Sequence, residues 1–131
     1  MSLFYKQRYF IASSFVKKTM IKIYIALIIL IFVFAVAHMI YMPFYTELAT
    51  TEAQLWFFSG GITMLLTGMI NYIRLKIASP LVKYTCVIAN FFVWVFTVIL
   101  CFVLPEPQVF GLVVILLAAT WVSFKYVAKS R

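Results

Sequence analysis

The sequence is poor in acidic residues, and their scarcity excludes several kinds of membrane chemistry. Its three carboxylates are Glu47, Glu52 and Glu106 among 131 residues. None lies within a long apolar run, so no carboxylate is placed to couple proton movement at membrane depth. The chain also has a single histidine, His38, and a haem held by two histidines is therefore excluded within one chain.

The few cysteines and glycines of the chain do not form any of the motifs that usually support chemistry. Cys86 and Cys101 are separated by about 22 Å along one expected helix, which is too far for a disulfide. The sequence has no Cys-x-x-Cys, no cluster of cysteine and histidine for zinc and no glycine-rich phosphate loop. Serine with a distant histidine and no acid at depth does not make a catalytic triad. We therefore predict no catalytic residues, no metal site and no cofactor.

Long apolar runs dominate the sequence instead. The chain is 66% hydrophobic and 11% charged, whereas a soluble domain is about half apolar and a quarter charged. About 20 apolar residues cross a hydrocarbon core, and four runs meet that requirement. We predict an all-α, four-helix transmembrane bundle in a single domain, 1–131. Its helices are expected at about 20–42, 51–75, 81–104 and 107–127, after a short segment at 1–19.

The charges are divided between the two ends of these runs. The cations flank the ends opposite to the glutamates: Lys6, Arg8, Lys17, Lys18, Lys22, Arg74, Lys76, Lys83, Lys125, Lys129 and Arg131. Basic flanks mark the cytoplasmic side of membrane helices, and short turns make neighbouring helices antiparallel. The pattern predicts an up-down-up-down topology with both termini cytoplasmic. The net charge of +8 is then a topology signal beside anionic headgroups, and we expect no nucleic-acid partner.

Two segments carry recognisable helix signals. Residues 1–19 mix aromatic and basic side chains, which suits a short amphipathic helix in the headgroup region. The alternatives are a frayed basic tail and a natural start at Met20. Thr50 or Thr51 is a suitable N-cap for the second membrane helix, with Glu52 in its first turn.

One ionisable side chain, His38, is expected at membrane depth near the acidic end of the first helix. Ionisable groups in such positions are functional candidates by default. If the first two helices pack together, its accessible neighbours are Tyr41, Tyr45, Glu52 and Trp56. A histidine–glutamate pair could relay protons or bind a cation. The alternative is a polar contact that only holds the two helices together.

Small and polar side chains recur along the second helix. Its stripe consists of Ser59, Thr63, Thr67 and Asn71, with Gly60 and Gly68 beside it. Spacing by four places these residues on one slowly drifting face, which should meet another helix because small residues let membrane helices approach closely. Asn90 and Thr97 share a face of the third helix. Packing is the simpler interpretation; the alternative is a small-molecule or headgroup site lined by Asn71, Asn90 and Arg74.

Two families of small four-helix membrane proteins fit the size but not the residues. Small multidrug-resistance transporters need a glutamate within the first helix, which is absent here, and small fluoride channels have a weaker charge bias. A resemblance to small bacterial four-helix inner-membrane proteins of uncharacterised function is carried by His38, Pro43-Phe44-Tyr45, Leu55-Trp56-Phe57-Phe58-Ser59-Gly60-Gly61, Gly68 and Asn71. It covers only the first two helices and implies a bacterial inner membrane, not an activity.

These observations favour a non-catalytic role. We predict an accessory or structural subunit of a larger membrane complex, because the turns are tiny and no acid lies within the membrane. The alternative is a small oligomeric transporter, channel or lipophile-binding protein that uses the polar stripe. The least favoured class is a lipid- or quinone-acting enzyme that uses His38 and Glu52. The expected partners are the lipid bilayer and either another membrane protein or further copies of this chain.

Overall fold

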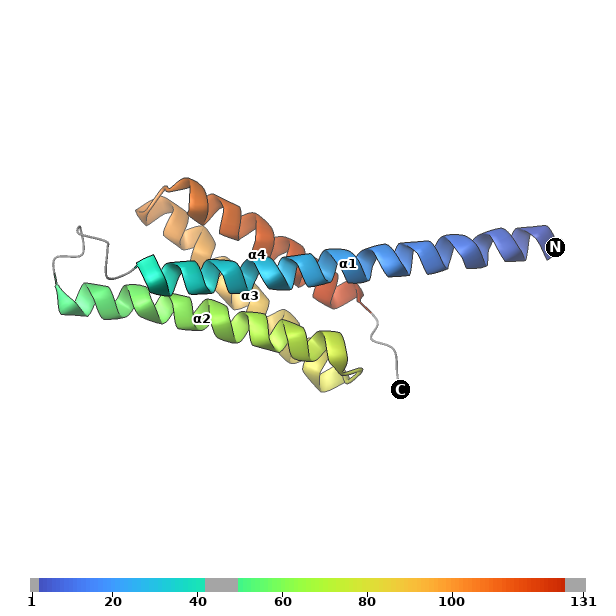
Figure 1. The fold of residues 1–131 in the computed structure, drawn as a ribbon, viewed down its shortest axis with the longest axis horizontal. Helices are drawn as coiled ribbons and strands as arrows, with labels where there is room; N and C mark the ends of the chain where they lie inside the picture. The colour runs from blue at the N-terminus through green and yellow to red at the C-terminus, as the bar shows by residue number, and fades with distance from the viewer. Residues whose placement is uncertain (1–2, 42–49, 127–131) are drawn as a thin grey trace.

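Four helices make up the computed structural model, which describes residues 3–41 and 50–126, with side chains from residue 16 on. The helices are α1 (Leu3–Tyr41), α2 (Thr51–Lys76), α3 (Pro80–Val103) and α4 (Pro107–Lys125). They run alternately up and down as two hairpins, α1–α2 and α3–α4, which cross at an angle (Figure 1). The predicted all-α four-helix bundle is confirmed, and the expected ends of α2 and α3 agree to within one residue.

The helix ends follow from the local sequence. Thr50 is the N-cap of α2, because its side chain accepts a hydrogen bond of 3.1 Å from a backbone N–H of the first turn, which also holds Glu52. Pro80 and Pro107 are the first residues of α3 and α4, where a missing backbone N–H is no loss. The connections that follow α2 and α3 are three residues long, which forces consecutive helices to be antiparallel.

The N-terminal part of α1 differs from the expectation. The sequence predicts a short interfacial helix at 1–19 ahead of a membrane helix from about Met20, whereas the structure has one unbroken helix from Leu3 to Tyr41. Neither proline nor glycine occurs between these residues, so nothing in the sequence interrupts the helix. The helix extends beyond the ends of the other three (Figure 1). The part that is apolar enough to cross a membrane is Val16–Tyr41, and the placement of the preceding residues among headgroups stays a prediction.

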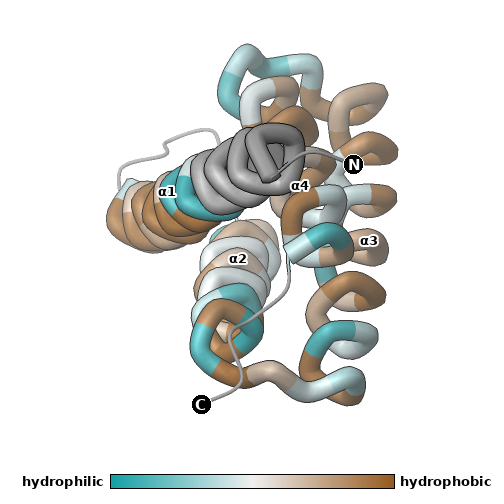
Figure 2. The backbone as a smooth tube through the Cα atoms, turned by 90° about the vertical axis from the view of Figure 1, so that its right-hand side faces the viewer, coloured by the Kyte–Doolittle hydropathy of each residue, from teal (hydrophilic) through white to brown (hydrophobic). Residues whose placement is uncertain are grey.

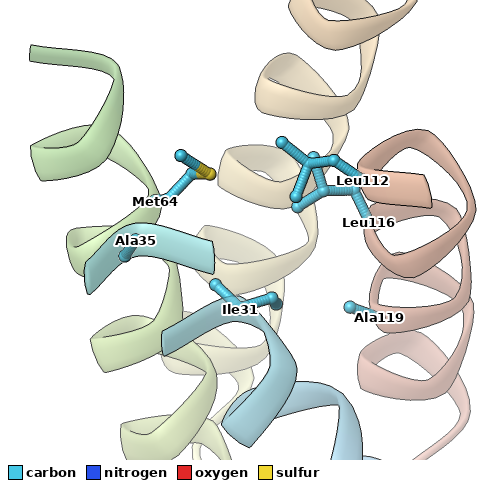
Figure 3. Packing of buried hydrophobic residues seen from close by; sticks show 6 residues of the cluster. All are labelled: Ile31, Ala35, Met64, Leu112, Leu116 and Ala119. Atoms are coloured by element: carbon cyan, nitrogen blue, oxygen red, sulfur yellow. The ribbon is translucent and has the colours of Figure 1, made fainter. Parts of the chain in front are cut away.

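The hydrophobic core lies where the two hairpins meet. α1 packs on α4 and α2 packs on α3, whereas the described backbones of α1 and α3 are not adjacent; these two helices touch through side chains, with the phenol oxygen of Tyr24 3.7 Å from Sγ of Cys86. The core cluster consists of Ile31 and Ala35 from α1, Met64 from α2, and Leu112, Leu116 and Ala119 from α4 (Figure 3). The two alanines take little space, and small side chains let membrane helices approach closely.

Two glycines of α2 allow close approach to α1. A Cβ atom at Gly61 would lie 3.2 Å from the backbone oxygen of Ala35 and 2.5 Å from Cγ of Met39. A Cβ atom at Gly68 would lie 3.0 Å from the ring of Phe32. Both glycines are buried, so the α1–α2 contact has no room for a larger residue without rearrangement.

The outer surface of the bundle is apolar. Every helix exposes large hydrophobic side chains, among them Val33, Leu66, Phe92 and Val114, and long hydrophobic stretches are visible on α1 and α3 in Figure 2. Soluble monomers rarely expose contiguous apolar surface of this extent. All four helices are long and apolar enough to cross a membrane. The chain is therefore a small polytopic integral membrane protein.

The charges occupy opposite ends of the bundle, as the sequence pattern predicts. Glu52 and Glu106 lie at the starts of α2 and α4, which mark the acidic end. The opposite end, here called the basic end, carries Lys22, Arg74, Lys76, Lys83 and Lys125. That the basic end faces the cytoplasm stays a prediction.

Candidate functional site

Polar side chains from α1, α2 and α3 meet inside the bundle towards its basic end. Asn71 and Asn90 are fully buried. Nδ2 of Asn71 donates to Oδ1 of Asn90 at 2.6 Å, and Nδ2 of Asn90 donates to Oδ1 of Asn71 at 3.0 Å. The phenol of Tyr24 and the thiol of Cys86 also donate to Oδ1 of Asn71, at 2.9 and 3.3 Å. We call these four residues the polar cluster.

The hydrogen-bonding capacity of Asn71 is fully used. Its Nδ2 donates both to Asn90 and to the backbone oxygen of Thr67, the latter at 2.8 Å, while its Oδ1 accepts three hydrogen bonds. Buried polar groups raise the free energy of the folded state unless they are paired. This pairing explains how two asparagines are accommodated in an apolar bundle.

A buried cation, Arg74, lies next to the polar cluster. It is only 3% exposed. Its Nη2 donates to the backbone oxygen of Tyr126, and its guanidinium lies 5.4 Å from the centre of the Tyr126 ring. That ring is also 5.4 Å from the ring of Tyr24. Arg74 thus binds the C-terminal end of α4, where the helix dipole favours a cation, while its Nε has no partner within the described residues.

The stripe along α2 divides into an exposed and a buried part. Ser59 and Thr63 are exposed, whereas Thr67 and Asn71 are buried. Steps of four residues drift by about 40° around an α-helix, so the stripe does not meet one neighbouring helix along its whole length. The hydroxyls of Ser59, Thr63 and Thr67 donate to carbonyls of α2 itself. Thr97, which is buried on α3, likewise donates to a carbonyl of its own helix at 2.7 Å.

His38 packs on α2 without pairing with the predicted glutamate. Its ring stacks on Phe57, with ring centres 3.7 Å apart, and is hydrogen-bonded to the Phe57 backbone. A Cβ atom at Gly60 would lie 3.2 Å from Nε2 of His38, so the glycine leaves room for the imidazole. No ion pair joins His38 to Glu52 in the part of the chain that the structure describes. The geometry fits a polar contact that holds α1 against α2.

Two other residues of that predicted site, Glu52 and Trp56, lie beside a depression on α2. Glu52 and Trp56 line a shallow, open depression on α2 together with Leu55 and Ser59. Trp56 is 73% exposed, so this depression does not shield a ligand from its surroundings. Tyr45 lies outside the described residues. Glu52 and Trp56 therefore share this depression, and His38 is not among its described lining residues.

The sequence-based interpretation missed two aromatic residues of the interior, Tyr24 and Tyr126. Tyrosines near the ends of membrane helices usually belong to the interfacial belt, yet both are buried here. A signal was available for Tyr24, because it lies at helical spacing from Ile28, Ile31 and Ala35. These residues form the buried face of α1, and side chains at such spacing share one side of a helix.

Comparison of the sequence with protein-family models, with curated proteins and with solved structures gives no match. The resemblance of the first two helices to small bacterial four-helix proteins therefore stays a prediction. The fold and the four candidate membrane spans are shown by the structure itself.

Proposed function

We propose that this protein is a non-catalytic accessory or structural subunit of a larger membrane complex. The observation that carries the proposal is that the polar side chains inside the bundle are bonded to one another. Tyr24, Asn71, Cys86 and Asn90 are fully buried and hydrogen-bonded to one another. Such an interior holds helices together, since its polar groups are engaged with each other instead of facing an open site.

The same interior disfavours a transport path along the polar stripe. A path would require water to reach Thr67, Asn71, Asn90 and Thr97, all of which are buried. The two threonine hydroxyls are already bonded to their own helices. We therefore assign the function to the outer surface of the bundle.

α3 has an outer face suited to a partner helix. Phe92 and Phe96 are exposed along this helix, and their spacing of four residues keeps them on one side. Aromatic side chains contribute strongly to interfaces because each buries a large area. These exposed phenylalanines lie on a side of α3 that no other described helix covers, which leaves them available to a second membrane protein.

The proposed location is a bacterial inner membrane with both termini in the cytoplasm. Its support is the separation of the charges, because basic residues are retained on the cytoplasmic side of membrane helices. In the described chain the glutamates lie at one end and the basic end is opposite. The resemblance of the first two helices to small bacterial proteins supports the choice of a bacterial inner membrane.

Native mass spectrometry of material extracted with mild detergent, at natural abundance, tests the proposed role. We expect the chain to be released together with larger membrane proteins in a fixed ratio. A chain that is released alone, or only with copies of itself, contradicts the accessory role.

A pair of double variants tests the α3 face. Phe92→Ala with Phe96→Ala should weaken retention of the partner at least about tenfold, since a hot-spot aromatic contributes about 2 kcal/mol. The matched control is Phe110→Ala with Leu117→Ala, which removes exposed apolar side chains from α4 and should leave the ratio unchanged. Equal losses in the two variants would mean that α3 has no special role in docking.

A further inference from the structure

Two lysines from different helices converge on one aromatic ring at the basic end. Nζ of Lys83, from α3, lies 4.5 Å from the centre of the Phe124 ring, and Nζ of Lys125, from α4, lies 5.9 Å from it. Each ammonium group also lies over a second ring: Lys83 over Tyr84 at 5.8 Å and Lys125 over Trp121 at 5.1 Å. Cations are attracted to the faces of aromatic rings, so both ammonium groups are held around the ring of Phe124 at the end of α4.

Nothing in the described chain neutralises this pair of charges. The described carboxylates, Glu52 and Glu106, begin α2 and α4 at the opposite end of the bundle. The C-terminal end of α4 contributes about half a negative charge, and Arg74 already donates to a carbonyl there. Two like charges beside one ring without a counter-charge repel each other, so an anion near both of them would stabilise the arrangement.

The contact of Lys83 with Phe124 distinguishes this place from ordinary basic flanks. Lys76 lies over Tyr72 at 5.3 Å, and that contact stays within one helix turn of α2. Such a pair needs no tertiary structure. Lys83 and Phe124 belong to α3 and α4, so their contact is set by the packing of these helices and brings the Lys83 cation to the end of α4 that carries Lys125.

We propose that Lys83 and Lys125 bind the phosphate of an anionic phospholipid at the α3–α4 edge of the basic end. Lys83 lies in the first turn of α3, and Lys125 is the last residue of α4, so both are at the level where a spanning helix meets headgroups. Two ammonium groups provide charge-assisted hydrogen bonds to phosphate oxygens. The exposed side chains of Leu117 and Trp121 provide apolar surface for the acyl chains of the same lipid.

The test is a lipid titration of the purified full-length protein in detergent, with bound lipid counted by native mass spectrometry. Phosphatidylglycerol should bind at least about tenfold more tightly than zwitterionic phosphatidylcholine. The double variant Lys83→Gln with Lys125→Gln should raise the Kd for phosphatidylglycerol about 30-fold, because each cation near an anionic lipid contributes about 1 kcal/mol. The matched control, Lys17→Gln with Lys18→Gln, removes two exposed lysines from α1 and should change the Kd less than about threefold.

Several results would overturn the proposal. Equal binding of the two lipids, or equal losses of affinity in the two double variants, would mean that Lys83 and Lys125 act only as general surface charge and do not form a lipid site. Displacement of phosphatidylglycerol by an equal concentration of inorganic phosphate would make this a site for a free anion. If lipid binding is unchanged in the Lys83 and Lys125 variant but the ratio to the partner protein falls, the lysines bind an acidic protein segment. The lipid site does not depend on the accessory role, since the titration needs no partner.

Discussion

Removing one member of the asparagine pair should destabilise the bundle, and removing both should recover part of that loss. Asn71→Leu nearly preserves the side-chain volume but removes hydrogen bonds to Tyr24, Cys86 and Asn90. Interhelical hydrogen bonds in membranes contribute about 0.6 kcal/mol on average, so three partners account for about 2 kcal/mol. Leaving Oδ1 of Asn90 without the donor that Asn71 supplies adds at least about 1 kcal/mol. The expected loss in the free energy of unfolding is therefore about 3 kcal/mol.

The double variant Asn71→Leu with Asn90→Leu separates pairing from packing. Replacing both partners of a buried hydrogen bond by apolar groups of similar shape can be nearly neutral. The loss of stability in the double variant should therefore be smaller than the sum of the two single losses. The difference, which is the coupling energy, should be about 1–2 kcal/mol. Tyr24 still loses its acceptor at 2.9 Å, so stability should not return fully to that of the natural sequence.

Reversible unfolding in mixed detergent micelles, followed by circular dichroism, measures these free energies. Thr97→Val is the control: this hydroxyl is also buried but donates only to the Val93 carbonyl of its own helix, so the change should stay within about 0.5 kcal/mol. A coupling near zero would refute the role of the pair in holding α2 against α3. A loss for Thr97→Val as large as that for Asn71→Leu would show that the assay reports burial alone.

Two further predictions concern packing and orientation. Gly61→Ala should lower stability in the same assay by about 1–3 kcal/mol, because its Cβ would lie 3.2 Å from the backbone oxygen of Ala35. Gly111→Ala should be neutral or stabilising by up to about 1 kcal/mol, since the nearest atom is 3.9 Å away, and equal losses at both positions would contradict the close α1–α2 contact. A reporter active only in the cytoplasm should be active when fused at Arg131 and silent when inserted beside Glu106; the reverse pattern contradicts the orientation inferred from the charges.

The elements of this fold were predictable because their signals are local. Uncharged runs predicted the four spans, and Thr50 or Thr51 followed by Glu52 predicted the start of α2. The separation of acidic and basic ends followed from counting charges along the chain. The continuity of α1 through residue 19 was not predicted, because a change from mixed to apolar composition there alters the environment of a helix without breaking it.

The hydrogen bonds between side chains inside the bundle were harder to predict from the sequence. Asn71 and Asn90 were each identified from the sequence, but the structure alone shows that their amides bond to each other, because that depends on the rotation of α2 relative to α3. The stripe suggested a single buried face, whereas the drift of four-residue steps leaves Ser59 and Thr63 exposed. Arg74 was placed at the membrane surface by its charge, yet the carbonyl of Tyr126 allows it to be buried.

The location of the polar cluster has a consequence for how this bundle selects one arrangement. Lipid chains are as apolar as leucine, so apolar packing gives four hydrophobic helices little reason to prefer one rotation over another. Asn71 can satisfy its amide only if α1, α2 and α3 are rotated to bring Tyr24, Asn90 and Cys86 to it. Arg74 then fixes the end of α4 by bonding to its last turn. Because these interior hydrogen bonds determine how each helix is rotated about its axis, the residues on the outer faces are not needed for that purpose. Those residues can instead be selected for contact with a partner protein or with lipid.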